Sequence, residues 1–403
     1  MINSKKIWGI LFAIIILLAI TQNTLASESS SWVGTWATSP QLVEDHNMPP
    51  DPGLANNTLR QIVRVSIGGE QIRLKFSNQY GNSPMELKSV YLAESKVGRS
   101  SINTDTEKVV TFEGNESVTI PAGETVISDT IDYNLPSLTT MAISINFGDT
   151  PDKLTGHPGS RTTSYLQQGN FINAPSLIIA KTIDRWYVIT GIDVFTEDLD
   201  KEAVVALGDS ITDGRGSTTN KNNRWTDILA ERLQNNNATS KVGVLNHGIG
   251  GNSVLSGGLG PTVLSRFDRD VIEQCGVRYL IIFAGVNDIG SSNSNTAEEL
   301  IEAYNQFISK AQQENILVYG ATILPFGDSG YYSQLNEETR QTVNEWIRTS
   351  GKFDAVIDFD AALRDPDNPE KILPLYDSGD HLHPSAAGYK KMGEIIDLNL
   401  FNK

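Results

Sequence analysis

The hydrophobic pattern of this chain changes near residue 200, and that change restricts the possible folds more than any other feature. Before it, apolar and polar residues alternate in short runs, as in the half-buried strands of antiparallel sheets. After it, continuous apolar runs alternate with stretches of helical periodicity, which is typical of a parallel sheet covered by helices. The sequence therefore predicts two domains of different class, at residues 27–198 and 199–403.

The first domain is predicted to be an antiparallel β-sandwich or jelly roll. One of its strands places Ile72, Leu74 and Phe76 on a single face. Turn signals such as Gly68-Gly69 and Gly81-Asn82 separate strands of this kind.

The second domain is predicted to have about five parallel strands with helices on both faces, a three-layer α/β/α arrangement. The expected strands are Ala203–Leu207, Val242–Asn246, Tyr279–Gly285, Ile316–Gly320 and Ala355–Phe359.

A serine stands where the first of these strands ends. Ser210 follows Gly208 and Asp209 at the carboxyl end of the strand, where open α/β sheets hold their chemistry. A serine hydroxyl becomes nucleophilic when a base takes its proton and a third group orients that base. Asp380 and His383 have the spacing D-x-x-H, which lets the carboxylate bind one ring nitrogen while the other stays free. These three residues are therefore candidates for a catalytic triad.

Two segments between Ser210 and His383 can donate hydrogen bonds to a developing oxyanion. One is the glycine-rich stretch Gly248–Asn252, where a glycine can expose its backbone N–H to a ligand. The other is Asn287, which follows a buried strand and offers a side-chain amide.

The four blocks together resemble the SGNH hydrolases, also called GDSL esterases and lipases, which are named for Ser, Gly, Asn and His. The blocks occur in the family's order. The resemblance implies a flavodoxin-like SGNH fold for the second domain, with Ser210 as nucleophile. It assigns the oxyanion donors to the N–H of Ser210, the N–H of Gly251 and the side chain of Asn287. It also assigns Asp380 and His383 to the rest of the triad.

Neighbouring residues leave alternatives open. Gly250 adjoins Gly251, so either could be the glycine donor. Asp377 and His381 compete locally with the predicted Asp–His pair, although hydrogen bonding within the loop is their simpler role. A second Gly-Asp-Ser at 327–329 is predicted to be only a turn.

No cofactor and no metal ion is expected. The G-x-S-x-G elbow of ordinary α/β-hydrolases is absent from the sequence, as are H-E-x-x-H and G-x-x-x-x-G-K-[ST]. His381 and His383 lie two positions apart, but no paired cysteine or second histidine cluster accompanies them.

Three further stretches resemble a two-domain secreted bacterial subgroup similar to xylanase-associated acetyl esterases: Trp32–Pro40, His157–Tyr165 and Asn223–Trp225. Trp32 and Trp36 could line a sugar site, although aromatic residues in a strand usually pack. Arg161 and Arg224 could contact substrate, whereas pairing with acidic residues at the surface is the simpler account.

The amino terminus has the anatomy of a secretory signal peptide. Two lysines precede an apolar stretch over residues 7–20, and the small residues that follow place cleavage after Ala26. Residues 1–26 are therefore predicted to be removed on export; the alternative is an uncleaved anchor, for which the apolar stretch is short. We expect a secreted protein with no stable membrane insertion after cleavage. Its single cysteine, Cys275, is expected to pack in the core.

The formal net charge of -16 argues against nucleic acid and anionic lipid as partners. The expected partner is a small ester or an acylated polysaccharide, and the oligomeric state stays open. The sequence predicts a secreted serine esterase that hydrolyses short-chain acyl esters, such as acetyl groups on plant polysaccharide, through an acyl-enzyme on Ser210. The alternatives are a lipase or polysaccharide O-acetyltransferase with the same triad, and a carbohydrate-binding protein with a vestigial hydrolase domain.

Overall fold

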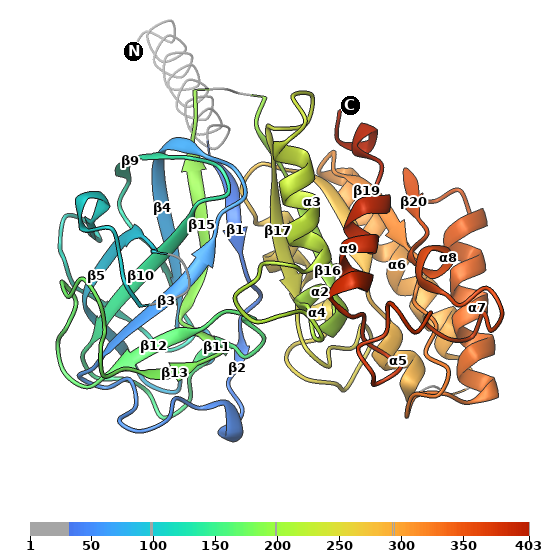
Figure 1. The fold of residues 1–403 in the computed structure, drawn as a ribbon, viewed down its shortest axis with the longest axis horizontal. Helices are drawn as coiled ribbons and strands as arrows, with labels where there is room; N and C mark the ends of the chain where they lie inside the picture. Colours follow the sequence, from blue (N-terminus) through green and yellow to red (C-terminus); the bar gives the residue numbers. More distant parts are fainter. Residues whose placement is uncertain (1–31, 97–99, 198–199, 292, 294, 403) are drawn as a thin grey trace, which may run out of the picture.

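A computed structural model describes residues 32–96, 100–197, 200–291, 293 and 295–402. Antiparallel sheets make up residues 32–197, here called the β half, and a parallel sheet with helices makes up residues 200–402, the α/β half (Figure 1). The predicted fold class, a flavodoxin-like α/β unit preceded by an antiparallel β unit, is confirmed. The predicted signal peptide and the predicted domain boundary at 198 and 199 lie outside the described residues.

The β half contains three antiparallel sheets. One has the order β1-β15-β4-β8 with β9 also paired to β4; its strands are β1 (Trp32–Ala37), β15 (Ile189–Phe195), β4 (Gly69–Ser77), β8 (Thr125–Ile127) and β9 (Ile131–Leu135). The second has the order β13-β12-β3-β10-β5-β6 with β7 also paired to β5; its strands are β13 (Lys181–Ile183), β12 (Ser164–Gln167), β3 (Thr58–Arg64), β10 (Thr140–Phe147), β5 (Met85–Glu94), β6 (Lys108–Val110) and β7 (Val118–Ile120). The third is small, with β14 (Trp186–Tyr187), β11 (Thr155–His157) and β2 (Gln41–Leu42). Ile72, Leu74 and Phe76 are buried together, as the alternation predicted.

The parallel sheet has the order β17-β16-β18-β19-β20. Its strands are β16 (Glu202–Gly208), β17 (Val242–Gly248), β18 (Val277–Phe283), β19 (Leu317–Ala321) and β20 (Ala355–Ile357). Because β16 comes first in the sequence but lies between β17 and β18, the strand order reverses beside it. Ligands of open α/β sheets bind in the crevice at such a reversal, so the fold places Ser210 in that crevice.

The last strand is shorter than predicted. It ends at Ile357 rather than Phe359, because the next residue caps a helix, α8 (Phe359–Leu363). The Asp358 side chain accepts a hydrogen bond from the Ala361 N–H at 3.0 Å. An N-cap carboxylate of this kind favours helix over strand for the residues that follow it.

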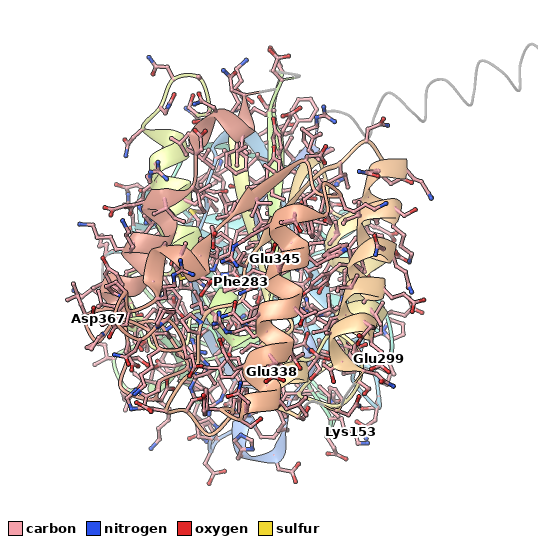
Figure 2. All side chains as sticks on the ribbon, turned by 90° about the vertical axis from the view of Figure 1, so that its right-hand side faces the viewer. Lys153, Phe283, Glu299, Glu338, Glu345 and Asp367 are labelled. Carbon is pink, nitrogen blue, oxygen red and sulfur yellow. The ribbon has the colours of Figure 1, made fainter. Side chains whose placement is uncertain are left out.

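Helices cover both faces of the parallel sheet. α3 (Trp225–Gln234) packs against α9 (Ala386–Ile395), and α6 (Thr296–Gln313) packs against α7 (Gln334–Thr349). Figure 2 shows the molecule from the side of α6 and α7, with Glu299 on α6 and Glu338 and Glu345 on α7 on the exposed side of each helix. The shorter helical segments are η2 (Asp45–Asn47), η3 (Thr104–Thr106), α2 (Ser210–Asp213), α4 (Val263–Phe267), the π-helical turn η4 (Asp268–Ile272), α5 (Val286–Gly290) and η5 (Leu398–Phe401).

The two halves share one continuous cluster of buried hydrophobic residues. β1 runs beside the edge strand β17, and a Cβ atom at Gly34 would lie 2.7 Å from the Leu245 side chain. The Ser66 hydroxyl of the β half accepts a hydrogen bond from the Val244 N–H at 2.9 Å. It thereby satisfies a backbone group on the edge strand β17, which has no further strand beside it in the parallel sheet. The Gly34 N–H donates to the Cys275 carbonyl at 2.9 Å.

The Cys275 side chain lies at this junction rather than deep in the core. It is partly buried, and Arg73 Nη2 donates to its Sγ at 3.2 Å. Among the described residues, no helix combines the length and the apolar character that a membrane span requires.

Candidate active site

Ser210, His383 and Asp380 lie in one hydrogen-bonded chain. Ser210 Oγ is 2.8 Å from His383 Nε2, and His383 Nδ1 is 2.7 Å from Asp380 Oδ2. With Nδ1 donating to the carboxylate, Nε2 is left to accept the serine proton. Ser210 and His383 are 6% and 5% exposed, so their contact is shielded from bulk water. The structure thus brings together the three residues predicted to form a triad.

Local backbone geometry places each of these side chains. Ser210 is the first residue of α2, because the Asp209 side chain caps that helix by accepting the Ile211 N–H at 2.9 Å. As a first helical residue, Ser210 has an N–H with no acceptor inside the helix. His383 precedes α9, whose N-cap is Ser385. Asp380 Oδ1 accepts the His383 N–H at 2.9 Å, which fixes the turn that carries both side chains.

The surroundings of Asp380 and His383 shift the pKa of each side chain. Burial alone would raise the pKa of Asp380, but hydrogen bonds from the His383 N–H and ring hold it at about 2. Burial lowers the pKa of His383, and the Asp380 carboxylate acts against that lowering. At neutral pH the pair therefore consists of an ionised carboxylate and a neutral imidazole, which is the form a general base needs.

The three predicted oxyanion donors line one cavity with His383. Ser210, Gly251 and Asn287 all contribute to a cavity of about 220 Å³. Gly251 has a φ of 67°, a left-handed conformation that favours glycine. Gly250 lines the same cavity, so the alternative glycine donor stays open. Asn287 Nδ2 donates one hydrogen to the Asn252 carbonyl at 2.8 Å, which leaves its second amide hydrogen for a ligand.

Tyr331 belongs to this site, although no sequence pattern pointed to it. Its hydroxyl donates to Asn287 Oδ1 at 2.8 Å and therefore fixes which way the amide faces. Tyr331 also lines the cavity, reaching it from the loop before α7. No spacing rule links it to Asn287, because the two residues are 44 positions apart.

The β half supplies one wall of the cavity. Gln41, Glu44 and Asn47 line it from β2 and the turn that follows, and Arg161 lines it from the loop after β11. Gln41 Nε2 donates to Glu44 Oε1 at 2.6 Å, and Asn47 Nδ2 donates to Glu44 Oε2 at 2.8 Å. The wall that the β half supplies is therefore polar, and its side chains already bond to one another.

Asp213 lies at the other end of α2, where the two halves meet. His157 Nε2 lies 2.8 Å from its Oδ1, and the Arg161 guanidinium donates to its Oδ2. Burial would raise the pKa of Asp213, but Arg161 and His157 hold it below its usual range. Sequence reasoning missed this role of Asp213, because both partners come from a distant segment.

The competing residues have other roles. His381 Nδ1 lies 2.6 Å from Asp377 Oδ2 in an exposed loop pair, as the simpler interpretation held. Arg224 is the N-cap of α3 and pairs with Asp227 in the first turn of that helix. Trp36 is 5% exposed and packs edge-on against Trp186, so it does not reach the cavity. Trp32 packs against Phe195.

Within the described ranges, no three His, Cys, Asp or Glu side chains gather as metal ligands would. The second Gly-Asp-Ser lies in the loop between β19 and α7, and Ser329 does not line the cavity that holds Ser210.

The sequence profile of the GDSL-like Lipase/Acylhydrolase family matches residues 206–391. A solved protein from Desulfitobacterium hafniense, assigned to the lipolytic G-D-S-L family, is 28% identical with a TM-score of 0.38, and the match covers 48% of this chain and 97% of that one. A GDSL-like lipase from Bacteroides thetaiotaomicron is 20% identical with a TM-score of 0.37, covering 48% and 85%. An acetyl xylan esterase is also 20% identical with a TM-score of 0.37, covering 48% and 96%. No curated protein matches the sequence.

Proposed function

Residues 206–391 form a GDSL-like lipase/acylhydrolase domain, an ester-hydrolysing unit as the sequence predicted, and from that premise we propose the substrate and the mechanism. The chain is a secreted serine esterase that removes short acyl groups, acetyl above all, from a hydroxyl-rich alcohol such as a plant polysaccharide. The observation that carries this proposal is the cavity at Ser210, which is small and has a polar wall from the β half.

Ser210 Oγ attacks the ester carbonyl while His383 Nε2 takes its proton. The Ser210 and Gly251 N–H groups and the free amide hydrogen of Asn287 stabilise the oxyanion. The imidazolium, held by Asp380, then protonates the leaving alcohol oxygen as the carbonyl reforms. Water enters, loses a proton to His383, and attacks the acyl-enzyme; collapse releases the carboxylic acid and restores Ser210.

The size of the cavity supports a short acyl group. Its volume of about 220 Å³ is below the roughly 300–1,000 Å³ of sites that enclose drug-sized ligands. A long acyl chain would have to lie outside it. Pro158, Leu259 and Leu382 contribute aliphatic surface to the cavity, which is enough for a small acyl group.

The polar wall supports a hydroxyl-rich alcohol. Glu44 accepts one amide hydrogen from Gln41 and one from Asn47, and each amide retains a second hydrogen. Such fixed amides and carboxylates match the paired donors and acceptors of neighbouring sugar hydroxyls. A site built of polar groups rejects an alcohol that leaves them unpaired.

The chain-length question is tested with p-nitrophenyl esters from acetate to palmitate, together with acetylated xylan. We expect acetate to be hydrolysed fastest and acetate to be released from the polymer. A preference for long acyl chains would favour a lipase. If acetyl were transferred to added sugar rather than to water, an acyltransferase would be favoured. If the polymer were bound without turnover, a vestigial hydrolase domain would be favoured.

The wall is tested with Glu44→Gln. We expect KM for acetylated xylan to rise about two- to ten-fold, the value of one hydrogen bond, with little change for p-nitrophenyl acetate. Glu338→Gln makes the same chemical change on the exposed side of α7 and is the matched control (Figure 2). Equal effects of the two variants on KM would show that the polar wall does not bind the polysaccharide.

Export is tested by sequencing the amino terminus of protein recovered outside the cell. The proposal requires a mature chain that begins at Ser27, because small residues precede that position. Recovery of a chain that still carries the apolar stretch, held on the membrane, would contradict it.

A further inference from the structure

The short helix that carries Ser210 is held at its far end by the other half of the molecule. Asp213 is the last residue of α2, three positions after Ser210, and is 1% exposed. Its Oδ1 is 2.8 Å from His157 Nε2, and its Oδ2 accepts a hydrogen bond from Arg161. Both partners belong to the β half.

His157 is itself fixed by its second ring nitrogen. Nδ1 is 2.9 Å from the carbonyl oxygen of Ser39, so both nitrogens face oxygen atoms and the ring cannot turn without losing a contact. The ring also stacks on Trp186 with centroids 5.8 Å apart. His157 is therefore a rigid support, 4% exposed, rather than a side chain that adapts to α2.

The backbone closes around Asp213 on two sides. A Cβ atom at Gly159 would overlap Asp213 Oδ2, and a Cβ atom at Gly248 would overlap the backbone of Asp213. Only glycine allows both chains to approach this closely. Arg161 reaches Asp213 from a left-handed conformation with a φ of 51°, which is uncommon for a residue with a side chain.

A four-residue helix cannot hold its own geometry, because isolated helices of that length are not stable. Its orientation depends on what holds its two ends. Asp209 caps the first end from within the α/β half. At the second end, Asn246 of β17 donates to the Thr212 carbonyl at 2.7 Å, while the Asp213 side chain is held by His157 and Arg161. A rotation of α2 would move Ser210 Oγ away from His383 Nε2, and misplacement of about 1 Å can cost 100-fold in rate.

We propose that His157 and Arg161 are positioning residues that hold Ser210 in line with His383 through Asp213, so that the β half is part of the catalytic unit. The inference rests on the proposed role of Ser210 as nucleophile. It concerns the rate of attack by that serine, and it is independent of which alcohol the enzyme accepts.

A second ion pair between the halves provides the control. Arg64 of β3 donates to Glu231 of α3 at 2.7 Å, and neither residue lines the cavity that holds Ser210. Loss of this pair weakens the contact between the halves without touching α2. Any effect that comes only from looser docking should therefore appear in Arg64→Met as well.

The test measures the rate at which a small fluorophosphonate labels Ser210, together with kcat and KM for p-nitrophenyl acetate and the melting temperature. We expect His157→Asn and Arg161→Met to slow labelling and lower kcat about 10- to 100-fold, with KM changed by less than about three-fold. Arg161→Lys, which keeps the cation, should recover part of the loss. Arg64→Met should label at close to the wild-type rate even if its melting temperature falls.

Two outcomes would overturn the inference: labelling at the wild-type rate in Arg161→Met, or equal slowing in Arg64→Met. If His157→Asn does not fold, the comparison of Arg161→Met with Arg161→Lys tests the inference. The Arg161 side chain is 28% exposed, so its replacement disturbs packing less. Labelling of a Ser210→Ala variant would instead contradict the proposed function, so the two failures are distinguishable.

Discussion

The α/β half and the β half reach the same cavity by different routes. In the α/β half, local turns and caps place the candidate catalytic side chains, as when Asp380 binds the backbone N–H and the ring of His383 three positions away. In the β half, Gln41 comes from β2 and Arg161 from the loop after β11, and both reach the cavity only because the halves pack together. The contrast separates chemistry, which the α/β half carries, from orientation and recognition, to which the β half contributes.

The largest expected effect falls on the nucleophile and base. Ser210→Ala and His383→Ala should each lower kcat by roughly 10⁴- to 10⁶-fold, and the double variant should be little worse, because triad members act as a unit. Hydrolysis of p-nitrophenyl acetate measures this loss. His381→Ala and Ser329→Ala are the matched controls in the exposed loop pair and in the second Gly-Asp-Ser, and both should keep nearly full activity. Full activity in Ser210→Ala would show that Ser210 is not the nucleophile.

The next effect concerns the orienting carboxylate. Asp380→Asn should lower turnover by up to about 10⁴-fold, because the neutral amide no longer selects the histidine tautomer that accepts from Ser210. The pH dependence gives a second readout. Activity rises with pH as His383 loses its proton, and burial lowers the pKa of His383 below its ordinary 6.5, so kcat/KM should reach half its maximum below pH 6.5.

The carboxylate acts against that lowering of the His383 pKa, so Asp380→Asn should move the midpoint to still lower pH. A wild-type midpoint above pH 6.5, or an upward shift in the variant, would contradict this account of the pair.

Arg266 tests whether the halves are one folding unit. Its guanidinium is fully buried and donates to Asp270 Oδ2 at 2.7 Å, to the Gly208 carbonyl at 2.7 Å, and to Ser39 Oγ of the β half at 3.0 Å. Arg266→Met leaves Asp270 with Arg269 as its remaining cation and leaves the buried Gly208 carbonyl without this donor, so it should lower the free energy of unfolding by about 2–4 kcal/mol in urea titrations.

Arg278→Ala is the control for Arg266→Met. It breaks a partly exposed pair with Glu202, 3.9 Å apart, and an exposed hydrogen bond to the Asn315 carbonyl, and should cost about 1 kcal/mol. Two separate unfolding transitions, with only one of them moved by Arg266→Met, would show that the halves fold independently.

The smallest of these effects separates stabilisation of the oxyanion from orientation of the base. Asn287→Ala should lower kcat by roughly 10²- to 10³-fold with no shift in the pH midpoint, because it removes only a donor. Tyr331→Phe removes the hydroxyl that orients the amide and should give a weaker loss of the same kind. A shifted midpoint in Asn287→Ala would mean that the amide acts on His383 instead.

The sequence determined the features that depend on neighbouring residues. The change of hydrophobic period predicted the two sheet types, since the period follows directly from strand and helix geometry. The end of β16 predicted where Ser210 would lie, and the D-x-x-H spacing predicted that Asp380 would reach the His383 ring. Small errors arose where a side chain competes with the pattern, as when Asp358 caps α8 and ends β20 early.

Only the tertiary structure decided the contacts between distant segments. Tyr331 orients Asn287 across 44 positions, and His157 meets Asp213 across 56. No periodicity or spacing encodes such pairs. The first forms when Tyr331 packs against α5 within the α/β half, and the second forms when the edge strand β17 packs beside β1 of the β half. Short local motifs mark the candidate catalytic side chains in the sequence. The wall of the cavity and the support of α2 depend instead on how the two halves pack.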